Sequence, residues 1–190
     1  MQSICLAQPL PCHLSIGTAA GVSNHLQGQN VNAISLDSAI IVTEISKRTL
    51  WRRLTDGQIT RLGSDERGRA MLAFDDLVPL LCVPVEPDDY QLFIAADGGD
   101  SAAQNDLAQL FLEAGKPEIA LYWLQSAVTA QQSVVSVDAM HNLAKLYFQG
   151  IGVPQDENTG LMWLAKAAAH GHVIAEQQMA ALMQRAKAEG

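Results

Sequence analysis

The sequence contains few cysteines and few charged side chains, and each shortage excludes a class of protein. Its three cysteines, Cys5, Cys12 and Cys82, are an odd number without the spacing of a disulfide framework. Charged residues make up 17% of the chain and hydrophobic residues 48%, as in a packed globular protein and unlike a disordered acidic segment. No apolar run reaches the roughly 18 residues of a transmembrane helix. Because the first residues also lack the basic start of a signal peptide, we expect a cytoplasmic protein.

Recognisable catalytic and metal-binding motifs are missing as well. The chain has no Gly-x-Ser-x-Gly elbow, no phosphate-binding Gly-Lys-Ser/Thr loop and no His-Glu-x-x-His pair. Three pairs of neighbouring carboxylates fall at predicted turns or helix starts, where capping explains them: Asp65–Glu66, Asp75–Asp76 and Asp88–Asp89. Cys5, Cys12 and His13 are one donor short of a structural zinc site, and His170 and His172 share an interhelical loop. We therefore predict no enzymatic activity, no cofactor and no metal.

A helical pattern recurs at a fixed spacing in the C-terminal half. Ala103, Ala139 and Ala175 stand 36 residues apart. The positions four, seven and eight residues after each are apolar too: Leu107, Leu110 and Phe111; Leu143, Leu146 and Tyr147; Met179, Leu182 and Met183. In each copy these positions form one stripe of a helix. A second apolar stripe follows the first in two of the copies, around Trp123 and Trp163. The loops between the stripes differ in length while the 36-residue spacing stays constant, which is typical of stacked helical hairpins.

The second copy resembles a Sel-like repeat, a relative of the tetratricopeptide repeat. The resemblance is carried by Asp138–Ala139, Leu143–Tyr147, Gly150–Val153, Asp156, Trp163–Ala168 and Gly171. The copy before it, 99–130, is similar but lacks the Gly-x-Gly-Val element, and the third copy stops after one helix that would act as a cap. The resemblance implies a mainly α fold, with a solenoid of about two and a half repeats over residues 91–190, and a role as an adaptor between proteins.

The N-terminal half divides at about residue 34. Residues 1–34 show no periodicity, and we predict an irregular or flexible leader. Residues 35–90 predict a small module whose elements follow in this order: a helix capped by Ser35, a helix Lys47–Thr55 capped by Ser46, a hairpin through Gly63–Gly68, and a helix Leu77–Leu81 capped by Asp75–Asp76.

This order resembles the winged helix of mercury-resistance-type regulators and phage excisionases. The resemblance is carried by Ile45–Arg53, Gly57–Ile59, Arg69 and Phe74–Leu77. It implies basic residues that contact DNA or an acidic partner: Lys47, Arg48, Arg52 and Arg53 on the helix, and Arg61, Arg67 and Arg69 on the wing. The family usually has glycine where Glu44 stands, and an acidic residue there opposes contact with phosphate.

The inner face of a hairpin solenoid is lined by the first helix of each pair, which makes it the candidate binding surface. Opposite the buried stripe this face carries mostly uncharged side chains: Asn105, Gln109, Leu112, His141, Lys145, Phe148 and Gln177. Such a surface suits a protein or peptide ligand. Two alternatives stay open, namely that Phe148 packs within its repeat and that the N-terminal module covers Leu112 and Phe148.

These observations lead to two main hypotheses. The first is a non-enzymatic cytoplasmic regulator that acts by protein–protein interaction, for example an anti-activator or adaptor bound to a transcription regulator. From Gln91 onward the chain has 5 Lys/Arg against 10 Asp/Glu, and this acidic half would suit a basic surface on the partner. The alternative is a DNA-binding transcription regulator that uses the repeats for dimerisation or partner binding. A scaffold in an envelope-linked assembly is a third possibility, which usually requires an export signal.

Overall fold

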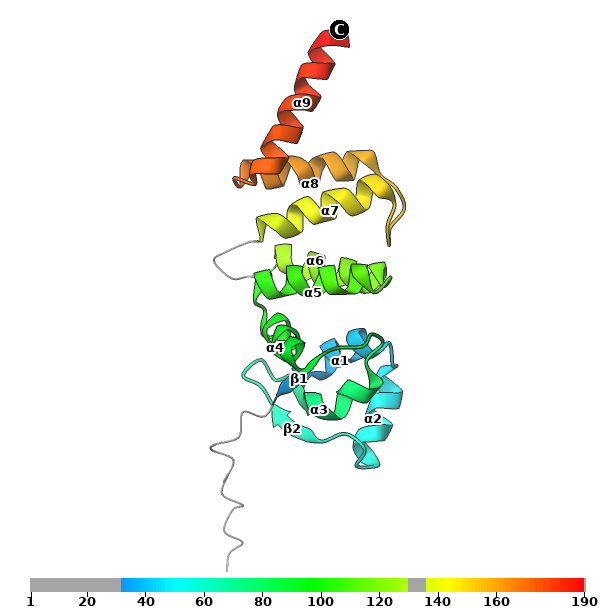
Figure 1. Cartoon of the computed structure of the whole chain (residues 1–190). Coiled ribbons are helices and arrows are strands. Elements are labelled where there is room, and N and C mark those ends of the chain that lie inside the picture. The colour runs from blue at the N-terminus through cyan, green and yellow to red at the C-terminus, as the bar shows by residue number, and fades with distance from the viewer. Residues whose placement is uncertain (1–31, 130–135, 190) are drawn as a thin grey trace, which may run out of the picture. The chain divides into compact units, whose positions relative to one another are not determined.

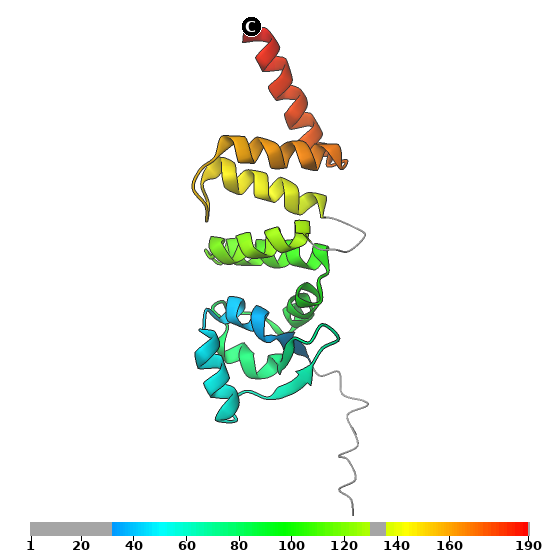
Figure 2. The same cartoon turned by 180° about the vertical axis from the view of Figure 1, so that it is seen from behind.

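The computed structural model describes residues 32–129 and 136–189, which form a small sheet with helices followed by stacked helix pairs (Figures 1 and 2). The chain divides into two units, Met1–Asn30 and Val31–Gly190, and every described residue belongs to the second. The predictions for the leader up to residue 31 and for Cys5, Cys12 and His13 lie outside the described residues. No helix in the described part of the chain is both long enough and apolar enough to cross a membrane.

The N-terminal group is a three-stranded antiparallel sheet in the order β1-β3-β2, accompanied by three helices. Ile34 of β1 pairs with Leu72 of β3, midway along the two strands, and both side chains are fully buried. Because β1 begins at Ala33, the sheet includes residues that the sequence assigned to the leader. The element bounds are β1 Ala33–Ser35, α1 Leu36–Thr43, α2 Lys47–Thr55, β2 Arg61–Ser64, β3 Ala70–Ala73 and α3 Phe74–Leu77.

Serine caps fix the starts of the first two helices, as predicted. The Ser35 hydroxyl accepts a hydrogen bond from the Ser38 amide, and the Ser46 hydroxyl accepts one from the Thr49 amide at 3.2 Å. The third helix was predicted wrongly. It begins at Phe74 and continues as a short 3-10 turn, η1 Val78–Leu80. Asp76 does not cap it, because its carboxylate accepts the Thr60 amide at 2.8 Å and so ties the helix to the hairpin.

The C-terminal group consists of two helix pairs, α5–α6 and α7–α8, and a single further helix, α9, which is the predicted arrangement. It is joined to the sheet through η2 Pro87–Asp89 and α4 Tyr90–Gly98. The helix bounds are α5 Ser101–Glu113, α6 Pro117–Thr129, α7 Val137–Gln149, α8 Glu157–Ala169 and α9 Val173–Glu189. Gly152, in the α7–α8 loop, has φ +70°, and a Cβ there would lie 2.9 Å from the Pro117 carbonyl carbon. Glycine therefore lets this loop pack against the start of α6.

The predicted stripe is buried in the first two copies and largely exposed in the third. Leu107, Phe111 and Leu143 are fully buried, whereas Met183 is 57% exposed. The tryptophans of the second stripe differ from each other. Trp123 is 2% exposed, while Trp163 is half-buried and has the Lys166 ammonium 4.3 Å from its ring centroid.

One hydrophobic core runs from the sheet into the first repeat. Phe74 of α3, Phe93 of α4 and Phe111 of α5 are all fully buried. The Phe74 and Phe93 ring centroids lie 5.3 Å apart, and those of Phe93 and Phe111 lie 6.1 Å apart. The N-terminal group therefore covers the first end of the helix stack and supplies the cap that a short solenoid needs.

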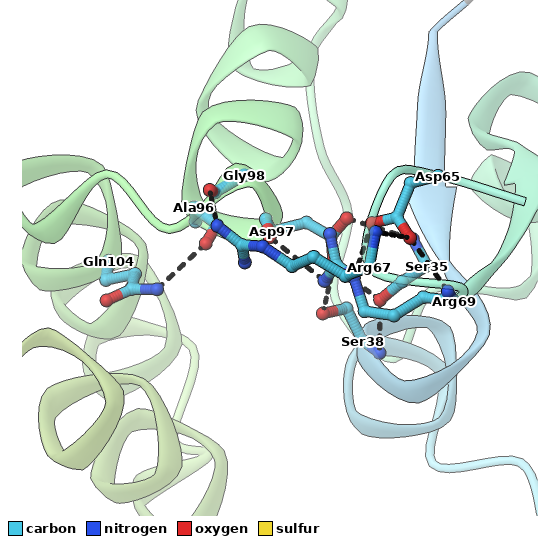
Figure 3. Close-up of polar contacts among 9 residues, drawn as sticks. All are labelled: Ser35, Ser38, Asp65, Arg67, Arg69, Ala96, Asp97, Gly98 and Gln104. Carbon is cyan, nitrogen blue, oxygen red and sulfur yellow. Dashed lines mark hydrogen bonds and ion pairs between the residues drawn. The ribbon is translucent and has the colours of Figure 1, made fainter. Parts of the chain in front are cut away.

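A buried carboxylate, Asp97 at the end of α4, joins the same two groups by polar contacts (Figure 3). It accepts the Ser35 amide at 3.0 Å, the Ser35 hydroxyl, and the Ser38 hydroxyl at 2.6 Å. The Arg69 guanidinium adds an ion pair at 3.0 Å. Since Asp97 is 5% exposed, these donors replace the water that its charge has lost.

Replacing Asp97 with alanine should lower the free energy of unfolding by about 3 kcal/mol, because buried donors of Ser35, Ser38 and Arg69 lose their acceptor. The matched control is Asp100→Ala, which deletes the exposed carboxylate that caps α5 and should cost about 1 kcal/mol. Urea unfolding followed by circular dichroism measures both. If both variants lost the same free energy of unfolding, Asp97 would contribute no more than an exposed helix cap does.

Candidate functional site

A groove of about 310 Å³ lies between α7, α8 and α9. Its lining side chains are His141, Ala144, Lys145, Phe148, Glu157, Leu161, Leu164, Gln178, Ala181, Leu182 and Arg185. Alanine, leucine and phenylalanine make up much of this lining, and charged or polar groups stand among them. An open apolar trough with a few polar groups is suited to a segment of another protein.

Three of the predicted inner-face residues, His141, Lys145 and Phe148, line this groove together. They project from one side of α7, at positions i, i+4 and i+7. Phe148 also packs against α8, because a Cβ on Gly160 would lie 2.7 Å from its ring. Phe148 therefore packs within its repeat, and its ring also lines the groove, in which no residue of the N-terminal group takes part.

The other predicted inner-face residues lie outside the groove. Asn105 is 8% exposed, and its side-chain oxygen accepts a hydrogen bond from Asn142 at 2.9 Å, so it joins α5 to α7. The buried Gln109 side-chain nitrogen has no hydrogen-bond partner within the described part of the chain. Leu112 lines a separate hollow of about 200 Å³, and Gln177 is exposed outside both.

Sequence reasoning missed the groove residues that come from α8 and most of those from α9. Leu161 and Leu164 belong to the second helix of the repeat, which the inner-face argument left out. On α9 the residue that lines the groove is Gln178 and not Gln177. Arg185 stands four residues after Ala181, one helical turn further along the same face of α9.

The groove carries two cations that form no ion pair among residues 32–129 and 136–189. Lys145 and Arg185 are both exposed, and Glu157 is the one acidic residue in the lining. The other lysines of this half include Lys116, which pairs with Glu44 at 2.6 Å, and Lys166, which lies over Trp163. An apolar groove with unpaired cations attracts acidic groups, even though the whole chain is acidic.

Two stacked histidines connect the groove to the start of α9. The rings of His141 and His172 lie 4.4 Å apart. His172 accepts the Ala175 amide on Nδ1 at 3.1 Å, and its Nε2 lies 3.3 Å from an Asp138 carboxylate oxygen. Burial lowers the pKa of His141, and the nearby His172 and Lys145 lower it further, against the opposing effects of the Gln178 hydrogen bond and the Asp138 charge.

The basic residues of α2 are placed as a surface patch. Lys47, Arg48 and Arg52 are exposed, and Arg53 is half-buried. None of the four forms an ion pair in the part of the chain that the structure describes. The exposed Arg61 guanidinium lies 5.8 Å from the Trp51 ring centroid, so it extends this patch from β2.

The two remaining arginines of the predicted wing bond within the chain. Arg69 pairs with Asp65 at 2.7 Å and with Asp97. Asp65 and Asp97 hold its guanidinium and leave it half-buried, which opposes the predicted contact with DNA or an acidic partner. Arg67 donates to the Gly98 carbonyl at 3.4 Å while remaining exposed.

The comparisons with known proteins concern the repeat half. Residues 101–131 and 137–172 match the Sel1 repeat, so α5–α6 and α7–α8 are two Sel1 repeats, as the resemblance predicted. Sel1 repeats generally mediate protein–protein interactions. The crystal structure of a Sel1 repeat protein from Oxalobacter formigenes is 27% identical, with a TM-score of 0.43. The match covers 58% of this chain and 33% of that chain, so the similarity spans a third of its length.

The comparison with curated proteins gives no match. No comparison supports the winged-helix resemblance of the N-terminal segment, although the structure contains its helices and hairpin in the expected order.

The lowered pKa of His141 predicts a loss of stability in mild acid. Between the unfolded value of about 6.5 and the lower folded value, the unfolded chain binds more protons, so the free energy of unfolding falls as the pH falls through this window. Urea unfolding at several pH values should show this decrease, and His141→Gln should reduce it. A variant with the same pH dependence as the wild type would contradict the prediction.

Proposed function

We propose that this protein is a non-enzymatic regulator that acts by binding another protein. The groove between α7, α8 and α9 holds a segment of the partner. One observation carries the proposal: the groove of about 310 Å³ is lined together by His141, Lys145 and Phe148, which come from a matched Sel1 repeat. A transcription regulator is the partner class we favour, on the ground of the sequence resemblance of residues 35–90 to regulator modules.

The chemistry of the groove specifies what kind of segment it takes. Phe148, Leu161 and Leu182 offer apolar surface to one or two aliphatic or aromatic side chains. Lys145 and Arg185 offer charge to carboxylates beside them. The segment is therefore short, apolar and acidic. The acidic composition of this half of the chain suggested a basic partner surface instead. The two differ because nearby cations, and not the net charge of the chain, determine the electrostatic potential inside the groove.

A peptide selection tests this proposal. Random peptides displayed on phage are selected on the wild type, and the enriched peptides should combine apolar with acidic residues. Their affinity should fall by about tenfold or more for the double variant Lys145→Glu/Arg185→Glu, because two favourable charges become repulsive. The charge-matched control is Lys47→Glu/Arg48→Glu on α2, which should bind as the wild type does. Peptides that bind both variants equally would contradict the proposal.

A DNA-binding role is the second candidate, and the exposed basic face of α2 favours it. Lys47, Arg48 and Arg52 are exposed and free of ion pairs among the described residues, and Arg61 lies beside them over Trp51. Such a patch can neutralise several phosphates. Two features of the same region oppose it, namely the internal engagement of Arg69 and the carboxylate of Glu44 at the α1–α2 turn.

Under this second role, Arg52→Ala should weaken binding to duplex DNA and reduce the salt dependence by about one released ion. Fluorescence anisotropy with a labelled duplex at several salt concentrations measures both quantities. Arg185→Ala in the groove removes the same charge elsewhere and should leave both unchanged. Equal effects of the two substitutions, or no binding by the wild type at low salt, would exclude α2 as a DNA contact.

A further inference from the structure

Helix α9 occupies the place of the first helix of a third repeat, but the described chain contains no second helix to cover it. At the 36-residue period, Met179, Ala180 and Met183 correspond to Leu143, Ala144 and Tyr147. Leu143 and Ala144 are at most 1% exposed, while Ala180 is exposed and Met183 is 57% exposed. In both views the second half of α9 extends away from α8 (Figures 1 and 2). Among the described residues, no helix covers this face of α9.

The uncovered face has a symmetric arrangement of side chains. Glu176, Ala180, Met183 and Lys187 follow at i, i+4, i+7 and i+11, so they lie within about 60° of one another around the helix. All four are exposed. Neither Glu176 nor Lys187 forms an ion pair within residues 32–129 and 136–189. The stripe has an acidic end, a basic end, and a small and a large apolar residue between them.

We propose that α9 pairs with α9 of a second copy of this chain, antiparallel about a two-fold axis. Both Glu176 with Lys187 and Ala180 with Met183 are centred on the same point, between Ala181 and Leu182. The axis therefore sets Met183 of one copy against Ala180 of the other, and Glu176 of one against Lys187 of the other. Every contact is made twice, as an isologous interface requires.

This pairing does not use the groove. Arg185 lies nearly opposite the stripe around α9, and Gln178 and Ala181 also face the groove. The dimer therefore leaves the groove of each copy open. Because one helix pair buries less area than a standard interface, the dimer dissociates in the micromolar range or above.

Sedimentation velocity of the full chain tests the pairing. The wild type should show a concentration-dependent monomer–dimer equilibrium. Glu176→Lys alone and Lys187→Glu alone place like charges at both ends of the pair, and each should raise the dissociation constant by about tenfold. An equimolar mixture of these two variants should recover wild-type association, because both ion pairs re-form in the heterodimer.

The mixture separates pairing from simple fraying of α9, since fraying in each variant would not be reversed by adding the other. Arg185→Glu is the control, because it reverses a charge on the groove side of α9 and should leave the dimer intact. This control also keeps the pairing distinct from peptide binding, which it should weaken. A wild type that stays monomeric, or a mixture no more associated than its components, would overturn the proposal.

Discussion

The buried charge of Asp97 is the interaction on which the arrangement of the described chain depends. It stands at the end of α4, where the sheet group passes into the repeats, and accepts hydrogen bonds from β1, from α1 and from Arg69, the residue before β3 (Figure 3). A carboxylate that is 5% exposed tolerates few alternative positions, because each lost donor leaves an unpaired polar group. The aromatic contacts from Phe74 to Phe111 bury apolar surface between the two groups. The hydrogen bonds and the ion pair of Asp97 fix the orientation of the two groups relative to each other.

The α1–α2 turn shows a second link between the two groups. Glu44 has φ 55°, and it is the non-glycine residue with positive φ among those described. That conformation is strained for a residue with a Cβ, and glycine would relieve it. Glycine, however, has no carboxylate to bind Lys116 in the α5–α6 turn. The departure from the winged-helix pattern therefore gives the turn a contact with the repeats.

The sequence predicted the elements whose signals are local or periodic. Serine caps predicted where α1 and α2 begin, and the stripe that recurs every 36 residues predicted α5, α7 and α9. Each of these signals lies within the helix that it predicts. The groove was found only in part. His141, Lys145 and Phe148 lie on one helix face, but the contributions of Leu161 and Arg185 depend on how α8 and α9 cross α7. The role of Asp97 was missed, since its partner Ser35 is 62 residues away.

Helix α9 explains how the proposed binding and pairing coexist. α9 presents the exposed Met183 on one side and groove residues on the other. Covering the Met183 face with a second copy removes apolar surface from water and holds the exposed half of α9 in place. That half carries Leu182 and Arg185, so pairing steadies one wall of the groove. Two copies then present two grooves, and a partner that is itself dimeric gains from binding both.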